Sequence, residues 1–493
     1  MIAAAQSPRP ASMPLIDHIA QLGVPLIDLT SDSRTVKHGS VFVAYPGSAR
    51  DGRAFIKEAI AKGATAVIWE RDNFRWNDAW DVPNLGVKGL RAQVSEIAGW
   101  VYGHPSEKLW MAGVTGTNGK TTVSQWIARS LDGLGRRSAV IGTLGNGLVG
   151  ALEDAKNTTP DAIVLQKLLA DYLRRGAQAA AMEVSSHGLD QGRTNGIKFD
   201  CAVFTNLTRD HLDYHGTMEA YAEAKFRLFS ARGLRSAVVN LDDDTGRAFA
   251  ARLHGGGLDV VTYGRHPDAR LHAIGIAQSE HGVSFQLDSD WGTAMVEAPV
   301  LGDFNVSNLL AVFGALVASG VDFDDAVRSL LLLTPVTGRL ERIGGGAQPL
   351  AVIDYAHSPD SLQKVLETLR PAVAAGGKLI CVFGCGGDRD AGKRPIMGAI
   401  AGRLADFTVA TSDNPRSEDP NAILAQVQRG IGAAPHEVIE DRQVAIYSAL
   451  ARAKSGDIVL IAGKGHETYQ EIGGRRLPFS DVEVARAALR EKQ

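Results

Sequence analysis

Short apolar runs alternate along this chain with longer stretches in which apolar residues recur every three or four positions, the spacing of a buried helix face. This rhythm divides the sequence into three blocks. In the first, which extends to about residue 106, apolar runs predict strands over 40–45 and 64–69, and helical spacing predicts a helix over 55–62. The turn residues Gly-His-Pro-Ser at 103–106 predict a linker at its end.

The second block repeats the order strand, loop, helix, which favours a mostly parallel sheet. One strand is expected directly before a glycine-rich turn, and others over residues 139–141, 179–184, 201–207 and 237–241. A glycine-broken stretch over 255–300 predicts additional strands, and 308–319 predicts a helix. The third block begins near Gly338 and returns to the same rhythm, with strands expected over 350–353, 378–383, 407–411 and 457–461.

Composition narrows the class of protein. Of the 493 residues 45% are hydrophobic and 22% charged, and the net charge of -3 predicts no bulk attraction to nucleic acid or anionic membranes. No apolar run approaches the ~20 residues of a membrane span. The first fourteen residues lack the features of a signal peptide and predict a loose tail. Three cysteines cannot build a disulfide framework, and a cytoplasmic location is expected. Cys381 and Cys385 lack a second pair, which disfavours a zinc site.

The sequence Gly-Val-Thr-Gly-Thr-Asn-Gly-Lys-Thr-Thr at 113–122 predicts a phosphate-binding loop. Gly116 and Gly119 let the backbone curl around an anion, and a helix beginning near Lys120 adds the positive end of its dipole. Lys120 and the Thr121 hydroxyl can then reach phosphates and a magnesium ion. Five residues rather than four separate Gly113 from Gly119, so this is a variant of the usual loop; a chance glycine turn is the alternative.

Polar side chains follow two further predicted strands. Glu183 ends one strand, and Asn-Leu-Thr-Arg-Asp-His-Leu-Asp at 206–213 follows the next. Parallel strands present their carboxyl ends at one edge of a sheet, so Thr121, Glu183 and His211 could hold magnesium there. A simple loop hydrogen bond is the alternative for His211.

Lys225 lies in a predicted helix over 218–229, on a face whose other members are Met218, Tyr221, Ala222 and Phe229. A lysine on an apolar stripe usually extends its ammonium group into water. A desolvated lysine can instead lose its proton and take part in chemistry.

Three motifs together make a resemblance specific: the loop at 113–122, Met-Glu-Val-Ser-Ser-His at 182–187 and the segment at 206–213. In this order they resemble the Mur ligases of peptidoglycan synthesis, and the match runs from Asp32-Ser33-Arg34 to Gly463-Lys464-Gly465-His466-Glu467. The resemblance implies an α/β protein of three domains, with a central ATPase-type, mostly parallel sheet and a Rossmann-like C-terminal domain. With the boundaries of the three blocks, the resemblance implies a UDP-muramoyl-substrate domain at 1–106, an ATP-binding domain at 107–337 and an amino-acid-binding domain at 338–493.

The family resemblance also implies the reaction and its residues. An ATP-dependent ligase would phosphorylate a peptide carboxylate, and an amino-acid amine would attack the acyl phosphate. Lys120, Glu183, His211 and Lys225 are implied as catalytic residues, with Lys225 carbamylated so that it helps Thr121, Glu183 and His211 hold Mg2+. The implied ATP-binding residues are Gly116, Thr117, Asn118, Gly119, Lys120, Thr121, Thr122, Asn305, Arg339 and Asp354.

A second implied set binds the UDP-muramoyl dipeptide. Short hydroxyl and amide side chains and one guanidinium suit a sugar, a pyrophosphate and a peptide carboxylate. The set is Ser31, Ser33, Asn157, Thr158, Thr159, Ser185, Gln191 and Arg193. Singly, such serines and threonines are also ordinary turn and cap residues. Ser48 and Ala49 stand where relatives often carry larger polar residues near the uracil, so the uracil contacts are left open.

The third block bears on the incoming amino acid. Arg389 replaces the last glycine of a Gly-x-Gly-x-x-Gly pattern, which argues against a nicotinamide cofactor. Asp-Asn-Pro-Arg at 413–416 matches the form of this motif that selects diaminopimelate in the family. Arg389 and Arg416 could clamp the extra carboxylate of diaminopimelate while Glu467 takes its amine. The full implied set is Arg389, Asp413, Asn414, Pro415, Arg416, Gly463 and Glu467.

Three alternatives stay open at this point. The four-residue motif at 413–416 could be a surface Asx-Pro turn. A related ligase, such as a folylpolyglutamate synthase, would share the phosphate loop but not this motif. A nucleotide-dependent switch would form no amide. The expected partners are small molecules (ATP, the UDP-muramoyl dipeptide and diaminopimelate), and a monomer is expected.

Overall fold

The computed structural model describes residues 14–47, 50–279 and 282–492, which form two compact units. One unit runs to Thr262 and adds Gly314–Val321; the other comprises Tyr263–Phe313 and the chain from Asp322 onward. Strand β12 (Asp259–Gly264) and helix α10 (Asp303–Ala318) each contribute to both units. The predicted N-terminal tail, up to residue 13, and the positions Ser48 and Ala49 lie outside the described residues.

The N-terminal part of the first unit is a four-stranded parallel sheet in the order β1-β2-β3-β4. Its central strands β2 and β3 are buried throughout, as expected for apolar runs covered on both faces. Its elements are α1 (Pro14–Ala20), β1 (Asp28–Thr30), η1 (Ser33–Thr35), β2 (Ser40–Ala44), η2 (Gly52–Phe55), α2 (Ile56–Ala61), β3 (Ala66–Glu70), β4 (Asn84–Val87), α3 (Leu90–Val101) and η3 (Pro105–Glu107).

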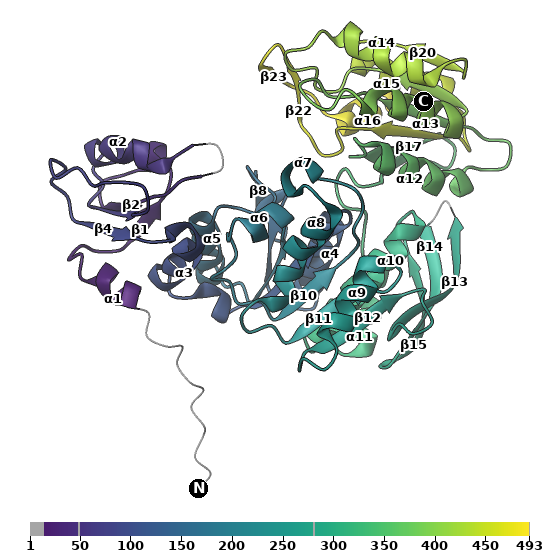
Figure 1. Cartoon of the computed structure of the whole chain (residues 1–493). Coiled ribbons are helices and arrows are strands. Elements are labelled where there is room, and N and C mark those ends of the chain that lie inside the picture. The colour runs from purple at the N-terminus through teal and green to yellow at the C-terminus, as the bar shows by residue number, and fades with distance from the viewer. Residues whose placement is uncertain (1–13, 48–49, 280–281, 493) are drawn as a thin grey trace. The chain divides into compact units, whose positions relative to one another are not determined.

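The rest of the first unit has a parallel sheet in the order β11-β10-β5-β9-β6, to which β7 and β8 add antiparallel. Helix α3 packs against α5 (Figure 1). The elements are β5 (Trp110–Thr115), α4 (Lys120–Gly133), β6 (Ser138–Gly142), β7 (Gly145–Leu148), β8 (Ala151–Glu153), α5 (Ala162–Arg174), β9 (Ala179–Glu183), α6 (Ser186–Asp190), β10 (Cys201–Phe204), α7 (Leu212–His215), α8 (Met218–Phe226), η4 (Arg227–Ser230), β11 (Ser236–Asn240) and α9 (Asp244–Leu253).

The second unit begins with the antiparallel strands β13 (Leu271–Ser279), β14 (Gly282–Ser289) and β15 (Gly292–Ala298), followed later by α11 (Phe323–Leu331). Its larger sheet has the order β16-β17-β21-β18-β19-β20, parallel except at β16. The elements are β16 (Glu341–Gly344), β17 (Leu350–Asp354), α12 (Pro359–Leu369), η5 (Arg370–Ala372), β18 (Leu379–Phe383), α13 (Lys393–Leu404), β19 (Phe407–Ala410), α14 (Pro420–Ile431), β20 (His436–Val438), α15 (Arg442–Arg452), β21 (Ile458–Ala462), β22 (Tyr469–Ile472), β23 (Arg475–Pro478) and α16 (Asp481–Glu491).

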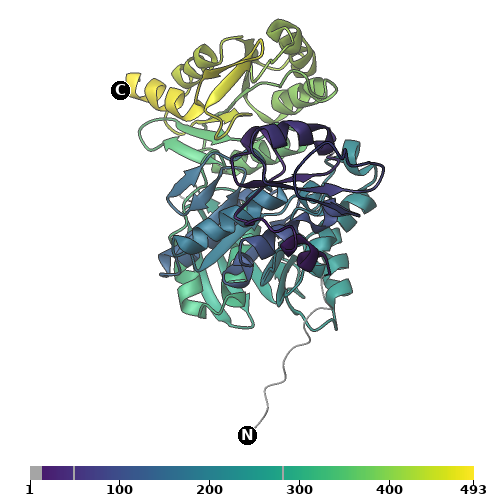
Figure 2. The ribbon, with the colours of Figure 1, turned by 90° about the vertical axis from the view of Figure 1, so that its left-hand side faces the viewer.

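This larger sheet has a core on each face. Leu379, Cys381 and Phe383 of β18 pack with α12, α13 and α14, whereas Ile380 and Val382 pack with α15 and α16. Successive strand residues point to opposite faces, so a strand covered on both sides must be apolar throughout. Helix α16 runs to the C-terminal end of the chain (Figure 2).

The structure confirms the α/β prediction, and most predicted strands agree with those observed to within a few residues. Two elements end three residues earlier than predicted. The strand expected to reach residue 207 ends at Phe204, because Thr205 and Asn206 turn to bond the glycine-rich loop. The helix expected to reach residue 229 ends at Phe226 and tightens into η4.

The cysteines are all reduced and buried: Cys201 in β10, Cys381 in β18 and Cys385 just after β18. No helix in the described ranges is long and apolar enough to cross a bilayer.

Candidate active site

The glycine-rich loop joins β5 to α4, as predicted. Gly116 has φ +148°, and a Cβ there would clash with Thr205 Oγ1, so only glycine fits against the end of β10. The N–H groups of Thr117 and Asn118 donate to Asn206, which fixes the loop. At the start of α4 the Val123 N–H donates to Gly119 O, and an anion binds well at such a helix N-terminus.

Lys120 folds back over this loop. Its Nζ donates to Gly116 O at 2.9 Å and to Thr117 O at 2.8 Å. The ammonium group therefore lies directly above the curled backbone. A phosphate bound to the loop would find this cation beside it.

Glu183 ends β9 with its side chain buried next to Thr121. The Thr121 hydroxyl donates to Glu183 Oε2 at 3.0 Å, and Thr143 donates its N–H to Oε1 at 2.7 Å and its hydroxyl to Oε2 at 3.3 Å. These donors carry no charge, so the negative charge of Glu183 is available to a cation. A buried carboxylate beside a threonine hydroxyl fits the oxygen ligands that Mg2+ prefers.

Gly142 packs against this carboxylate. A Cβ at position 142 would clash with Glu183 Oε1, although the backbone there suits any residue. We expect Gly142→Ala to displace the carboxylate and to lower turnover by about 10–100-fold, since displacements of about 1 Å have effects of that size. Steady-state kinetics would measure this.

Gly133→Ala is the matched control, because Gly133 lies at the exposed end of α4 with open space around it. Equal activity losses in the two variants would contradict the role assigned to the position of Glu183.

Lys225 lies in α8 and is fully buried, in agreement with its place on the apolar face of the predicted helix. Its Nζ donates to Gly116 O at 2.7 Å and lies 4.5 Å from the centre of the Tyr221 ring. Burial, followed by the nearby charge of Lys120, lowers the pKa of Lys225 well below its usual value. The amine is thus held next to the glycine-rich loop in a form that favours loss of its proton.

His211 lies in a cluster of rings, with its centre 4.9 Å from that of His187 and 6.0 Å from that of Tyr221. It adopts φ +52°, and 46% of its side chain is exposed. Tyr221 therefore connects His211 to Lys225 through ring contacts. Within the described ranges no group of three or more His, Cys, Asp or Glu side chains could hold a metal ion. Of the predicted metal ligands, Thr121 and Glu183 contact each other directly through a hydrogen bond.

Three residues of the predicted dipeptide set, Asn157, Gln191 and Arg193, line a cavity of about 250 Å³. Arg193 donates to Gln191 Oε1 and to Thr159 O. Sequence reasoning missed three other residues of this cavity, Tyr45, Arg91 and Asp161.

Other members of the predicted dipeptide set make internal contacts. The Thr159 hydroxyl donates to Glu183 O and accepts from the Ser185 N–H, and the Ser185 hydroxyl caps α6. The Thr158 and Thr143 hydroxyls are 3.0 Å apart. Ser33 donates to Glu58, and Ser31 bonds Tyr45, whose hydroxyl reaches Asp161. Thr159 thus ties the end of β9 to the start of α6.

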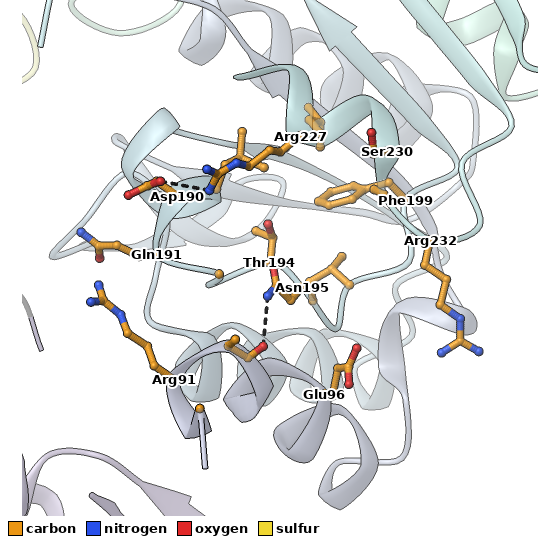
Figure 3. A pocket seen from close by; sticks show the side chains of 17 residues that line it. Arg91, Glu96, Asp190, Gln191, Thr194, Asn195, Phe199, Arg227, Ser230 and Arg232 are labelled. Atoms are coloured by element: carbon orange, nitrogen blue, oxygen red, sulfur yellow. Dashed lines mark hydrogen bonds and ion pairs between the residues drawn. The ribbon is translucent and has the colours of Figure 1, made fainter. Parts of the chain in front are cut away.

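A larger cavity of about 780 Å³ shares Arg91 and Gln191 with the first (Figure 3). The Arg227–Asp190 ion pair, 3.0 Å long, lies at its rim, and Asn195 donates to Ala92 O. Apolar side chains such as Phe199 and polar ones such as Glu96 and Arg232 line it together. Arg91 therefore lines both cavities.

In the second unit, the nucleotide residues predicted by resemblance make local contacts. The Asn305 amide donates to Leu301 O and accepts from Asn308. Asp354 is buried and accepts the N–H groups of Leu340 and Ala356; burial raises its pKa. The Arg339 guanidinium lies 4.7 Å from the centre of the Tyr355 ring, and its buried Nε has no hydrogen-bond partner among the described atoms.

The loops that follow β18, β19 and β21 bring the predicted amino-acid set together. The Asn414 amide donates to Glu467 Oε2 at 2.9 Å, and the buried Lys464 Nζ donates to the same oxygen at 2.9 Å and to Asn414 Oδ1 at 3.1 Å. Asp413 is buried, and a Cβ on Gly463 would lie 2.6 Å from its Oδ2. Lys464 is a member of this network that sequence reasoning missed.

Arg389 and Arg416 both lie beside Gly386. A Cβ at position 386 would lie 2.9 Å from Arg416 Nη1 and 3.8 Å from Arg389 Cγ. Arg416 donates to Gly387 O at 2.7 Å and lies 3.7 Å from Glu471, whereas Arg389 is exposed. The Arg416 guanidinium and the aliphatic stem of Arg389 thus border Gly386, next to Asn414 of the carboxylate network.

Comparison with known proteins agrees with this geometry. Family models match over three segments: the Mur ligase family catalytic domain (28–101), the Mur ligase middle domain (114–316) and the Mur ligase glutamate ligase domain (338–465). A UDP-N-acetylmuramoyl-L-alanyl-D-glutamate--2,6-diaminopimelate ligase from Pseudomonas aeruginosa is 52% identical, over 94% of each chain. The chain belongs to the Mur ligase family.

Further relatives of this Mur ligase extend the match. A ligase of the same name from Chromobacterium violaceum is 50% identical over 96% of each chain. A solved structure of that name has a TM-score of 0.70 and 41% identity over 95% of each chain. MurF ligase from Thermotoga maritima, solved in complex with ADP, shares the fold at 20% identity, with a TM-score of 0.66 over 94% of this chain and 98% of that chain. The three-domain Mur ligase architecture follows, and the family is ATP-dependent.

Proposed function

We propose that this Mur ligase joins meso-diaminopimelate to UDP-N-acetylmuramoyl-L-alanyl-D-glutamate, with ATP as co-substrate, in the synthesis of peptidoglycan precursors. One observation carries the choice of amino acid: Arg389 and Arg416 border Gly386 beside the Glu467–Lys464–Asn414 network. Diaminopimelate ends in a carboxylate and an ammonium group on one carbon, and this site offers cations and a carboxylate together. Lysine has no distal carboxylate that could pair with either arginine.

The first step in this proposal forms an acyl phosphate. The γ-carboxylate of D-glutamate attacks the γ-phosphorus of ATP, the bond to the bridging oxygen breaks, and ADP leaves. Lys120 and the N–H groups at the start of α4 bind the phosphates and stabilise the charge that develops. Mg2+ held by Thr121, Glu183 and His211 would neutralise phosphate charge when bound.

The second step forms the amide. The amine of diaminopimelate attacks the acyl carbon, phosphate leaves, and the amine releases a proton. Arg389, Arg416 and Glu467 hold the far end of the amino acid, so only its other amine can reach the acyl phosphate.

Carbamylation of Lys225 is part of this proposal. A neutral lysine amine adds to CO2, which forms an N–C bond and releases one proton. The lowered pKa of Lys225 favours the neutral amine that this addition needs. The product is an anion beside Lys120, so the repulsion that two ammonium groups would feel is replaced by attraction, and the new carboxylate can support the cation site.

The UDP-muramoyl dipeptide is assigned to the cavity that Asn157, Gln191 and Arg193 line, with Arg91 and Tyr45 as further contacts. Further contacts to the dipeptide are proposed for Thr158, Thr159, Ser185, Ser31 and Ser33, and further nucleotide contacts for Asn305, Arg339 and Asp354. We further propose that the protein acts in the cytoplasm as a monomer.

Phosphate release tests the function. With ATP, magnesium and the UDP-muramoyl dipeptide, we expect continuous release only when diaminopimelate is added. Equal release with lysine would contradict the proposed selectivity. Release without any amino acid would favour a nucleotide-dependent switch instead.

A further inference from the structure

The residues proposed to bind diaminopimelate lie on three separate loops. Arg389 follows β18, Asn414 and Arg416 follow β19, and Glu467 follows β21. The carboxylate and ammonium group at the far end of the ligand share one carbon, so their partners must keep a fixed separation. The spacing between the β19 and β21 loops is therefore a determinant of selectivity.

A buried guanidinium bridges these two loops. Arg442, the first residue of α15, donates through Nη1 to Ser412 O at 3.2 Å and through Nη2 to Ala462 O at 3.0 Å. Each acceptor carbonyl immediately precedes a residue of the proposed site, Asp413 or Gly463. Arg442 thus bonds the backbone of both loops at the point where each begins.

Asp481, the first residue of α16, holds this guanidinium. Arg442 Nε and Nη2 each donate to an Asp481 oxygen at 2.8 Å, and both side chains are fully buried. Helices α15 and α16 pack together on one face of the sheet (Figure 1). Helix α16 therefore fixes the orientation of the Arg442 guanidinium through Asp481.

Stability alone is a weak reason for this ion pair. Replacing a fully buried pair by apolar residues of similar size is often neutral or stabilising, because desolvation offsets the attraction. The contacts of Arg442 with two loop carbonyls suggest another role. A planar guanidinium can serve a carboxylate and two carbonyls at once, whereas an ammonium group cannot keep that geometry.

We propose that Arg442, oriented by Asp481, is a positioning residue that sets the spacing of the β19 and β21 loops and thereby the selectivity for diaminopimelate. The proposal rests on the proposed function, because it assigns the amino-acid site to these loops. Arg442 reaches the ligand only through the loop backbone.

The single variant Arg442→Lys tests this idea. A second, double variant, Arg442→Met/Asp481→Leu, removes both members of the buried ion pair, so that neither charge is left buried without its partner. We expect KM for diaminopimelate to rise at least 10-fold and the preference for diaminopimelate over lysine, as a ratio of kcat/KM, to fall at least 10-fold. Formation of the acyl phosphate, trapped with hydroxylamine as a small nucleophile, should stay within twofold of wild type.

Arg452→Met is the matched control. Arg452 lies at the other end of α15, pairs with Glu437 and stacks on Phe407, away from the two loops. Its kinetics should match those of wild type.

Several outcomes would overturn the proposal. An unchanged KM for diaminopimelate, a parallel loss of trapped acyl phosphate, or failure of both variants to fold would show that Arg442 serves general stability only. A wild-type enzyme that traps acyl phosphate yet makes no amide with diaminopimelate would instead contradict the proposed function.

Discussion

Lys225→Met is expected to lower turnover at least about 100-fold while leaving the protein as stable as wild type or more stable. The loss of turnover follows from the position of Lys225, whose amine lies 2.7 Å from Gly116 O in the phosphate loop. The gain in stability follows from burial, because methionine fills a similar volume without a polar group. Functional sites often carry such a cost in stability.

The pH dependence of stability provides a sharper measurement. In bicarbonate-free buffer the folded-state pKa of Lys225 is lower than its unfolded value of about 10.5, so between these two values the unfolded chain binds more protons. The stability of wild type should then rise with pH in this window relative to Lys225→Met. The advantage of the methionine variant is largest below the folded-state pKa and shrinks toward pH 10. Urea unfolding at several pH values would show this.

Lys364→Met serves as the control, since Lys364 forms an exposed pair with Asp360 in α12. It should change stability by less than about 0.5 kcal/mol and leave turnover intact.

Bicarbonate should raise the activity of wild type and leave the activity of Lys225→Met unaffected. Full turnover in the methionine variant would remove Lys225 from the mechanism.

Arg416→Met is expected to lower kcat/KM for diaminopimelate by about 100–1,000-fold, the effect of removing one partner from a charge-assisted contact worth about 3–4 kcal/mol. Activity with lysine should change less than about threefold, because lysine has no carboxylate for this cation. The measurement is amide formation with each amino acid under otherwise equal conditions.

Arg416→Lys separates charge from geometry. Lysine keeps the positive charge but loses the planar fork, so an intermediate loss is expected. Arg416 also adopts φ +53° and bonds Gly387 O, so its replacement could disturb the loop itself. Equal losses with diaminopimelate and lysine would identify such damage and argue against a selective role.

Local patterns in the sequence predicted much of the fold. Strands such as β18 are apolar throughout because both faces are buried, and that pattern is visible without a structure. Helical spacing placed Lys225 on a buried face, and the glycine spacing placed Lys120 beside a phosphate loop. These features depend on residues close together in the chain.

Features that depend on distant residues could not be predicted in this way. Arg442 and Asp481 look like surface residues in the sequence, since arginine and aspartate are rarely buried unless paired. Only the packing of α15 against α16 brings them together. Arg91 is similar: it reaches the cavity of Asn157 from a helix more than sixty positions away in sequence. The early end of β10 also depends on the glycine-rich loop about 90 residues before it.

The burial of all three thiols limits how this protein can be inhibited covalently. Burial raises the pKa of Cys201 and Cys381 well above the usual range and that of Cys385 to about 12. Acrylamides and chloroacetamides react with thiolates, so Cys201, Cys381 and Cys385 offer such warheads no accessible target.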